Sequence, residues 1–317
     1  MAGEVIVVAL GGNAICQSDQ KGTTDEQLQN VDVTASQIAK LVKAGNQLVV
    51  THGNGPQVGD LMVQMEAGKE FVPSQTMFVC GAMTQGSIGW MMANRLQYHL
   101  NNMGIKKPVC TVITQMLVSD QDPDFQDPSK PVGVFYTKEE AMKLKEEMGY
   151  TVKEVKPGAE KAWRRVVPSP DPMELIEGES IALLAKNGVI VVADGGGGIP
   201  VRRTADGNLV GVDAVIDKDQ GGFRLCQVVQ ADKYIILTDV EKACLNYGKP
   251  DQKEVGTVTL AEMEKYYNEG HFMKGSMGPK VMACMRFVRE TGREAIITSL
   301  HKVDAALEGK TGTRITP

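Results

Sequence analysis

The chain has 317 residues, a hydrophobic content of 42% and a net charge of −5, which fit one large α/β domain or two ordinary lobes with a sizeable core. No segment has the basic density of a nucleic-acid or membrane-surface patch, and no apolar stretch approaches the ~18 residues of a membrane span, so we expect a cytoplasmic protein with small-molecule partners. The six cysteines and four histidines show no metal-ligand spacing, so we expect no metal held by protein side chains.

The first elements predict a parallel sheet. An apolar strand at residues 5–10 is followed by a helix, with Thr24 and Gln27 as a capping-box pair and Gly45 at its end. A second apolar run at residues 48–50 completes a strand–loop–helix–strand unit, which is typical of parallel strands.

Two helices are predicted next, at residues 56–65 and about 74–103. The second is rich in methionine and glycine, which favours packing within a core or across a dimer seam. Residues 119–169 then depart from this pattern, with repeated prolines, many charges and one short helix at 137–148. Short β-prone pieces flank that helix, so the segment is interpreted as a small protruding subdomain.

Strands and helices alternate again after residue 169. The predicted elements are a helix at 174–186, a strand at 189–193, a hairpin turn at Asp206-Gly207, a strand at 234–238, a helix at 259–269 with a Thr259/Glu262 capping box, and a helix from Pro279 to Gly292.

Three of the apolar runs end in glycine, at residues 11–12, 53–55 and 195–198. Glycine turns at the carboxyl ends of parallel strands let backbone N–H groups approach an anion, and a following helix adds the positive end of its dipole. Because such ends share one edge of an open sheet, the three turns predict a single phosphate-binding crevice.

Dinucleotide and P-loop fingerprints fit this chain poorly. The glycine spacing at 53–59 is stretched, and Pro200 stands where the pattern at 195–200 requires its last glycine. Residues 304–311 resemble the end of a P-loop but begin with Asp304 in place of glycine, so an ordinary turn is expected there.

Two charged segments are more specific. Asp217-Lys218-Asp219 taken alone is a solvated charge cluster, but Lys280 stands near a predicted helix start, after Gly275. A cation beside the positive end of a helix dipole is unfavourable unless an anion binds there, so this arrangement indicates bound phosphate.

Six ordered segments carry a family resemblance that extends from residue 5 to about residue 315. They are residues 9–14, 52–59, 195–200, 217–219, 237–240 and 275–280. Together they resemble the carbamate kinases within the amino acid kinase family. The resemblance implies an open αβα sandwich around a mainly parallel eight-stranded sheet, forming one kinase domain over 1–317. It also implies an acceptor lobe at 1–200 with the protruding subdomain at about 119–169, a nucleotide lobe at 201–317, and a homodimer.

The implied activity is reversible phosphoryl transfer between ATP and carbamate, giving ADP and carbamoyl phosphate, with Mg²⁺ held mainly by the nucleotide phosphates. A protein of this kind resembles the ATP-forming last step of arginine breakdown. The family's usual lysine before the first glycine pair is missing at Ala9. The resemblance implies that Lys130 supplies that charge, and we expect the two prolines that flank it to hold it on a stiff, exposed tip.

The resemblance assigns a role to each candidate site residue. The catalytic set is Lys130, Lys218, Asp219, Lys280, Gly11, Gly12 and Asn13; the substrate-binding set is Gly53, Asn54, Gly55, Gly196 and Gly197; and the nucleotide-binding set is Asp217, Thr238, Asp239, Tyr247, Gly275 and Met277.

Three other functions remain open. An acetylglutamate or uridylate kinase would have the lysine that is missing at Ala9 and would lack the 119–169 segment. A carbamoyl phosphate synthase that uses free ammonia would share the motifs, and only an assay separates it. A catalytically dead nucleotide sensor would lose the phosphate lysines, which are present here.

Overall fold

The computed structural model describes residues 3–17, 19–273 and 275–317. Its centre is an eight-stranded sheet in which all neighbouring strands are parallel except β16 and β17. In sheet order the strands are β15 (Thr257–Thr259), β17 (Thr313–Thr316), β16 (Ala295–Ser299), β12 (Lys233–Thr238), β1 (Val5–Leu10), β2 (Gln47–His52), β9 (Ile190–Val192) and β3 (Val109–Thr111).

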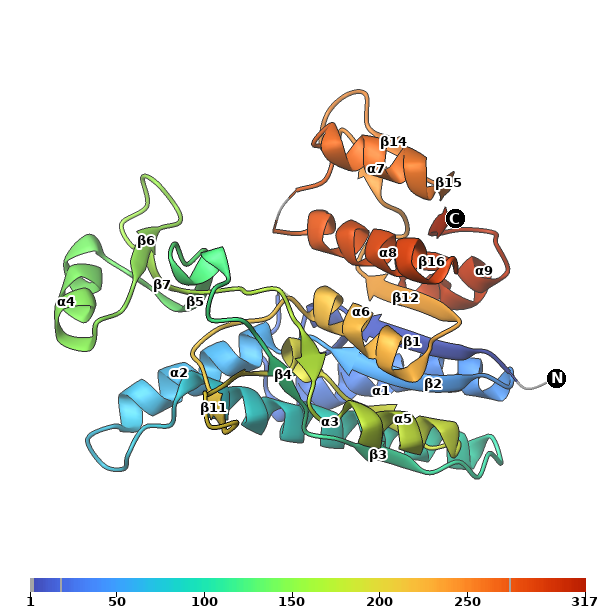
Figure 1. Cartoon of the computed structure of the whole chain (residues 1–317), viewed down its shortest axis with the longest axis horizontal. Helices are drawn as coiled ribbons and strands as arrows, with labels where there is room; N and C mark the ends of the chain where they lie inside the picture. The colour runs from blue at the N-terminus through green and yellow to red at the C-terminus, as the bar shows by residue number, and fades with distance from the viewer. Residues whose placement is uncertain (1–2, 18, 274) are drawn as a thin grey trace.

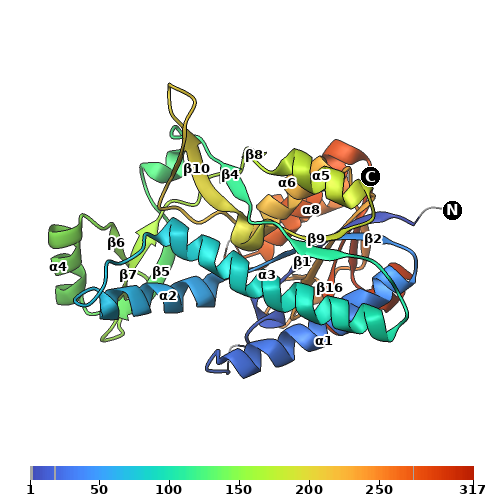
Figure 2. The same ribbon diagram turned by 90° about the horizontal axis from the view of Figure 1, so that it is seen from below.

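Helices cover both faces of this sheet (Figures 1 and 2). In β1, Ile6 and Val8 pack with α1 (Thr24–Lys43) and α3 (Met77–Asn102), while Val7 on the opposite face packs with α5, α6 and α8. Strands that are buried on both faces form continuous apolar runs, which is why the sequence shows them so clearly. The predicted αβα sandwich is confirmed.

The remaining elements complete the layers and the site. The other helices are α2 (Gly55–Gly68), α4 (Lys138–Met148), α5 (Gly178–Lys186), α6 (Lys218–Val229), α7 (Leu260–Asn268), α8 (Met277–Thr291) and α9 (Val303–Leu307), with 3₁₀ turns η1 (Gly12–Ala14), η2 (Pro123–Phe125), η3 (Gly195–Gly197) and η4 (Leu300–Lys302). A four-stranded sheet joins β11 (Leu209–Gly211), β10 (Ile199–Arg203), β4 (Gln115–Leu117) and β8 (Glu174–Leu175), and β13 (Cys244–Leu245) pairs with β14 (Lys253–Glu254). No helix among the described residues is long and apolar enough to cross a membrane.

The predicted protruding subdomain is present and stands out at the left of Figure 1. It joins α4 to a three-stranded sheet of β5 (Lys130–Tyr136), β7 (Trp163–Val167) and β6 (Val152–Glu154). A Thr137/Glu140 capping box begins α4, and Gly149, with a φ of 68°, ends it.

Several predicted helix starts are wrong by a few residues. The capping box of α1 is Thr23/Glu26 rather than Thr24/Gln27, because Thr23 has the extended backbone of an N-cap. The helix predicted from 174 begins at Gly178, since Glu174–Leu175 forms β8. Likewise α3 begins at 77 rather than 74, and α8 begins at 277 rather than 279.

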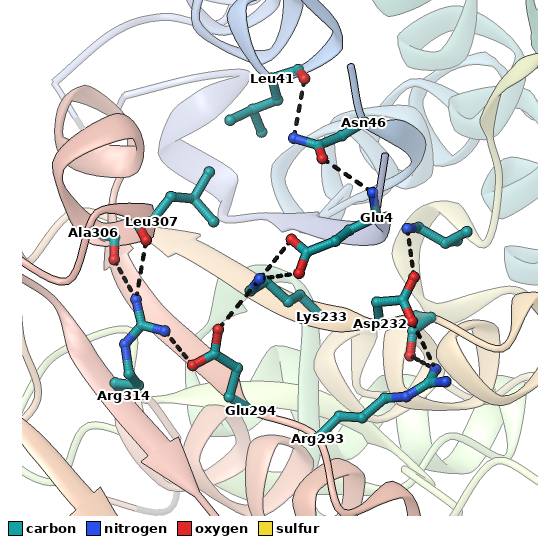
Figure 3. Close-up of polar contacts among 12 residues, drawn as sticks. Glu4, Leu41, Asn46, Asp232, Lys233, Arg293, Glu294, Ala306, Leu307 and Arg314 are labelled. Carbon is teal, nitrogen blue, oxygen red and sulfur yellow. Dashed lines mark hydrogen bonds and ion pairs between the residues drawn. The ribbon is translucent and has the colours of Figure 1, made fainter. Parts of the chain in front are cut away.

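An ion-pair network joins the amino ends of the central strands (Figure 3). Lys233 of β12 pairs with Glu4 and with Glu294, and Glu294 also pairs with Arg314 of β17. Beside it, Asp232 accepts a hydrogen bond of 2.8 Å from the Val5 backbone. The same carboxyl group pairs with Arg293 at 3.3 Å, so this network, at the edge opposite the glycine turns, links segments from both ends of the chain.

Candidate active site

The three glycine turns meet at the carboxyl edge of the central sheet. A methyl group added to Gly53, after β2, would lie 3.6 Å from the Gly12 backbone nitrogen, after β1. A methyl group on Gly196, after β9, would lie 2.3 Å from the Asn54 amide nitrogen, and Gly196 has a φ of +69°. The turns meet as predicted, although they line two cavities rather than the single crevice expected. The approach at Gly196 leaves room only for glycine.

Two lysines share one buried carboxylate beside these turns. Lys218 Nζ lies 2.5 Å from Asp219 Oδ1, and Lys280 Nζ lies 3.1 Å from Asp219 Oδ2. The Asp219 side chain is 2% exposed, and burial alone would raise its pKa. The charges of Lys218 and Lys280 outweigh burial and lower the pKa of Asp219 below its usual value. Two cations against one anion leave a surplus positive charge that suits a phosphate.

The first turns of α6 and α8 bring these lysines together. Asp217 caps α6: its Oδ1 accepts hydrogen bonds from the backbone N–H groups of Asp219 at 2.9 Å and Gln220 at 3.3 Å. Capping therefore engages one oxygen of Asp217, and its predicted contact with the nucleotide stays a prediction. Lys280 lies in the first turns of α8, which begins at Met277.

A cleft of about 490 Å³ opens at Lys218 and Lys280. Its lining includes six of the residues predicted to contact phosphates or nucleotide: Gly11, Gly12, Asn13, Thr238, Asp239 and Gly275. The cleft thus combines backbone donors with the two surplus-charge lysines, which is the composition expected of a polyphosphate site.

A smaller cavity of about 110 Å³ adjoins this cleft and shares Thr238 and Asp239 with it. The predicted nucleotide residues Tyr247 and Met277 line it, so the structure brings these four together. Phe272 lines the same cavity and was not predicted. Its position just before the glycine motif at 275–280 was the available signal.

A further cavity, of about 490 Å³, lies between α2, α3 and the protruding subdomain. Four predicted residues line it: Asn54, Gly55, Gly196 and Lys130. Gly53 is placed against Lys218, 3.3 Å from its Cδ when a methyl group is added. Gly197, predicted to bind substrate, is buried instead, where a methyl group would lie 2.9 Å from the Ile216 carbonyl oxygen. It packs the turn against the segment before α6.

The position of Lys130 differs from the predicted stiff, exposed tip. Lys130 is half-buried and begins β5, where it pairs with Val167 of β7. Pro131 lies inside the strand, opposite Val166, which is tolerated because β5 is at the edge of its sheet. A strand rather than a proline-bounded turn therefore holds Lys130 at the wall of the cavity.

Buried polar side chains of α3 hold the glycine turns, and sequence reasoning missed them. Thr84 Oγ1 accepts a hydrogen bond of 2.9 Å from Asn54 Nδ2. Gln85 Nε2 donates to the carbonyl oxygens of Gly195 at 3.0 Å and Thr114 at 3.1 Å. Two adjacent polar residues within a helix that otherwise buries methionine and isoleucine were the signal that could have found them.

Two titratable groups lie beneath the turns. Burial, aided by the Lys218 charge and opposed by a hydrogen bond with Gly53, lowers the pKa of His52 to about 4. Asp194 is fully buried with a left-handed φ of 57°, and neither carboxyl oxygen has a hydrogen-bond partner among the residues described. Burial raises the pKa of Asp194 well above its usual value, although Lys218 opposes this.

Comparisons with known proteins agree with this geometry. The sequence model of the amino acid kinase family matches residues 4–299. The carbamate kinase of Thermococcus kodakarensis is 54% identical over 98% of this chain and 98% of its own length. The carbamate kinase of Trichomonas vaginalis is 50% identical over 98% of this chain and 99% of its own. Among solved structures, carbamate kinase from Giardia lamblia bound to AMP-PNP superposes with a TM-score of 0.94 at 44% identity, covering 99% of each chain.

Proposed function

The chain belongs to the amino acid kinase family, and we propose that it is a carbamate kinase, which moves a phosphoryl group reversibly between ATP and carbamate. The products in this direction are ADP and carbamoyl phosphate. One observation carries the proposal: Lys218 and Lys280 share Asp219 at the edge where the glycine turns of the phosphate cleft and the acceptor cavity touch. Phosphoryl transfer needs surplus positive charge at such a point.

The proposed mechanism uses cations and backbone donors and needs no general base. The attacking carbamate oxygen is already ionised at neutral pH, so no proton has to be removed. Lys218 and Lys280 neutralise charge on the transferring and β phosphates, and Asp219 holds both ammonium groups in place. The backbone N–H groups of Gly12 and Asn13 and the Asn13 amide bind the phosphoryl group in transfer, whereas the Gly11 N–H donates to the Leu237 carbonyl oxygen at 2.8 Å and shapes the turn.

On the acceptor side, Asn54 and Lys130 hold carbamate or its phosphate, with Gly53 allowing the close approach of Lys218. Ala9 is fully buried and carries no charge toward the site. The subdomain therefore supplies the acceptor's cation, from Lys130 at the start of β5.

On the nucleotide side, the cavity lined by Tyr247, Met277 and Phe272 takes the adenine, and Thr238 and Asp239 face the ribose. Residues 1–200 then form the acceptor lobe and residues 201–317 the nucleotide lobe. Mg²⁺ is held chiefly by the nucleotide phosphates and water, because Asp219, the carboxylate between the two phosphate lysines, is already engaged by both of them. When bound, the metal neutralises phosphate charge.

We also propose a homodimer that pairs through the outer face of α3. Met83, Trp90 and Tyr98 are 42%, 56% and 50% exposed and recur at helical spacing on that face. Replacement of Trp90 by Glu should convert a dimer to a monomer in sedimentation. An unchanged mass would place the interface elsewhere. We place the enzyme in the cytoplasm, in the ATP-forming step of arginine breakdown that the family resemblance implies.

The test of the function is ATP formation by the purified protein from carbamoyl phosphate and ADP with Mg²⁺. Turnover is expected, and robust phosphorylation of acetylglutamate or uridylate instead would refute the proposal. An ammonia-using synthase is separated by comparing ATP-dependent carbamoyl phosphate formation with ammonia and with carbamate at matched concentrations. Nucleotide binding without any turnover would identify a sensor.

A further inference from the structure

Arg164, on β7 of the protruding subdomain, differs from the other arginines in its charge environment. The chain has ten arginines, and nine of them have a carboxylate oxygen within 4.0 Å. Arg164 has no ion pair in the part of the chain that the structure describes. Its neighbour Arg165 shows the usual pattern, with Asp213 at 2.8 Å. A guanidinium without a counter-ion is therefore specific to this one position.

The unpaired guanidinium lies at the wall of the acceptor cavity, which Lys130 also lines. Arg164 Nη2 donates a hydrogen bond of 2.7 Å to the Gly133 carbonyl oxygen, and the guanidinium stacks 5.0 Å from the centre of the Phe135 ring. Gly133 has a φ of +69° and lies where the register between β5 and β7 is irregular. Such irregularities redirect a strand locally, and the contacts with Gly133 and Phe135 hold the guanidinium at the cavity wall.

The hydrogen bonds of Arg164 are also incomplete. Its Nε is buried and has no acceptor among the described residues. Burial lowers the pKa of Arg164, yet a guanidinium stays protonated in proteins. Asp60 of α2 lines the same cavity but makes no ion pair with Arg164. A partly desolvated cation without a counter-ion is costly unless a ligand supplies the negative charge.

We propose that Arg164 is a substrate-binding residue that recognises the planar carboxylate of carbamate, or the carbamoyl end of carbamoyl phosphate. The inference rests on the proposed function and states how the site recognises the acceptor substrate. A guanidinium presents parallel N–H groups that match a planar O–C–O group, whereas the ammonium of Lys130 acts as a point charge. The subdomain thus supplies both a charge and a shape-selective donor pair.

The test is steady-state ATP formation from carbamoyl phosphate and ADP by the wild type and by Arg164→Met and Arg164→Lys. Methionine keeps the apolar stem against Phe135 and removes the charge. It should raise the KM for carbamoyl phosphate about tenfold or more, as loss of a charged hydrogen bond does, with the KM for ADP changed less than about twofold. Lysine should restore the KM only in part, because it lacks the planar fork.

Lys161→Met is the matched control, since Lys161 is an exposed cation of the same subdomain outside the cavity lining. It should change neither KM. An active wild type whose Arg164→Met variant keeps its KM for carbamoyl phosphate would overturn the inference and leave the proposed function intact. A lowered Tm with unaltered KM would also overturn it. A wild type that makes no ATP would refute the function itself. If the methionine variant folds poorly, the lysine variant carries the same comparison.

Discussion

The two edges of the central sheet carry ion pairs of different composition. At the amino edge three carboxylates face three cations: Glu4, Asp232 and Glu294 against Lys233, Arg293 and Arg314 (Figure 3). At the carboxyl edge Lys218 and Lys280 share Asp219 alone. The charges of the first set cancel within the protein, whereas the charges of the second set cancel only when an anion binds.

This difference separates structural charge from functional charge. A balanced network satisfies its own hydrogen bonds and holds strand ends together, so it has no use for a ligand. A buried site with surplus charge is destabilising on its own and is typical of binding and catalysis. Lys130 and Arg164, which line the acceptor cavity without carboxylate partners among the described residues, follow the second pattern. Each prediction below changes one member of these sets or Asp194, which belongs to neither.

The largest expected effect is that of Lys218→Ala at the carboxyl edge. Loss of one preorganised cation in a water-poor site should reduce turnover about a hundredfold or more, equivalent to roughly 3 kcal/mol of transition-state stabilisation. Lys280→Ala should behave similarly. Single-turnover ATP formation measures the loss, and circular dichroism checks that the variants fold. A folded variant with near-normal turnover would remove its lysine from the mechanism.

At the balanced edge, Glu294→Gln should lower stability and leave the kinetics unchanged. Although burial opposes ionisation, Arg314 and Lys233 lower the pKa of Glu294 below its usual value of 4.5. A lowered folded-state pKa contributes stability above pH 4.5 that disappears as the pH falls below it. At pH 7 the variant should lose about 1.5–3 kcal/mol, as for a hydrogen bond to a charged group.

Urea unfolding at pH 7 and again near pH 4 measures this effect. The gap between the wild type and Glu294→Gln should narrow at the lower pH. A fall in kcat of the folded variant would mean that the amino edge affects the site, and the division between the two edges would then be wrong.

Asp194→Asn tests a buried carboxyl group that belongs neither to the balanced network nor to the cations with surplus charge. Because burial raises the pKa of Asp194, the folded state binds a proton that the unfolded state does not over the pH range between the unfolded carboxyl's value near 3.8 and the raised folded value. Its contribution is therefore present below pH 3.8 and is lost as the pH rises through the folded-state pKa, by at most about 1.4 kcal/mol per pH unit. Asparagine does not titrate and tolerates the left-handed φ, so the variant should lack this slope.

Unfolding measured from pH 5 to pH 9 for both proteins isolates the slope, because the contribution of His52 cancels in the difference. As the pH rises, the free energy of unfolding of the asparagine variant should increase relative to that of the wild type, and its kcat should be retained. Equal slopes together with a reduced kcat would show that Asp194 is ionised and partly offsets Lys218. The carboxyl edge would then be closer to balance than the ion pairs indicate.

Prediction from sequence succeeded where local chemistry determines the structure. The runs at residues 5–10 and 234–238 are apolar because both faces of the sheet are buried, and their strands formed as predicted. Thr259 and Glu262 cap α7 through contacts confined to one turn. Errors arose where a contact with a distant part of the chain determines the local structure. Glu174–Leu175 pairs with β4 as a strand, so α5 begins after it rather than at residue 174.

The same distinction holds within the site. Glycine turns at three strand ends predicted that these turns would meet, because parallel strands end at one edge of the sheet, and the structure brings them together. The roles of Thr84, Gln85 and Asp194 depend on contacts with residues far away in the chain, which spacing does not reveal. The strand at Lys130 was hidden by its flanking prolines, since an edge strand tolerates proline and a central one does not.

The smallest expected effect on stability is that of Lys130→Ala. The side chain is half-buried at an edge strand and makes no ion pair in the described structure, so its loss should cost less than about 0.5 kcal/mol. Loss of its charge should weaken binding of the acceptor substrate. The KM for carbamoyl phosphate should therefore rise, while the KM for ADP stays nearly constant. The two KM values should respond differently because Lys130 lines the acceptor cavity and not the nucleotide cleft.

Thermal unfolding and steady-state kinetics on the same preparation test both parts. Lys153→Ala is a suitable control, because Lys153 lies in the same subdomain and is already paired with Asp127 at 2.5 Å. It should alter neither KM, since its charge is balanced by a neighbour. If Lys130→Ala melts much lower and its kinetics per folded molecule are unaltered, Lys130 is structural. An unpaired cation at the cavity wall would then be no sign of function in this protein, because Lys130, one of the two such cations with Arg164, would have no ligand to bind.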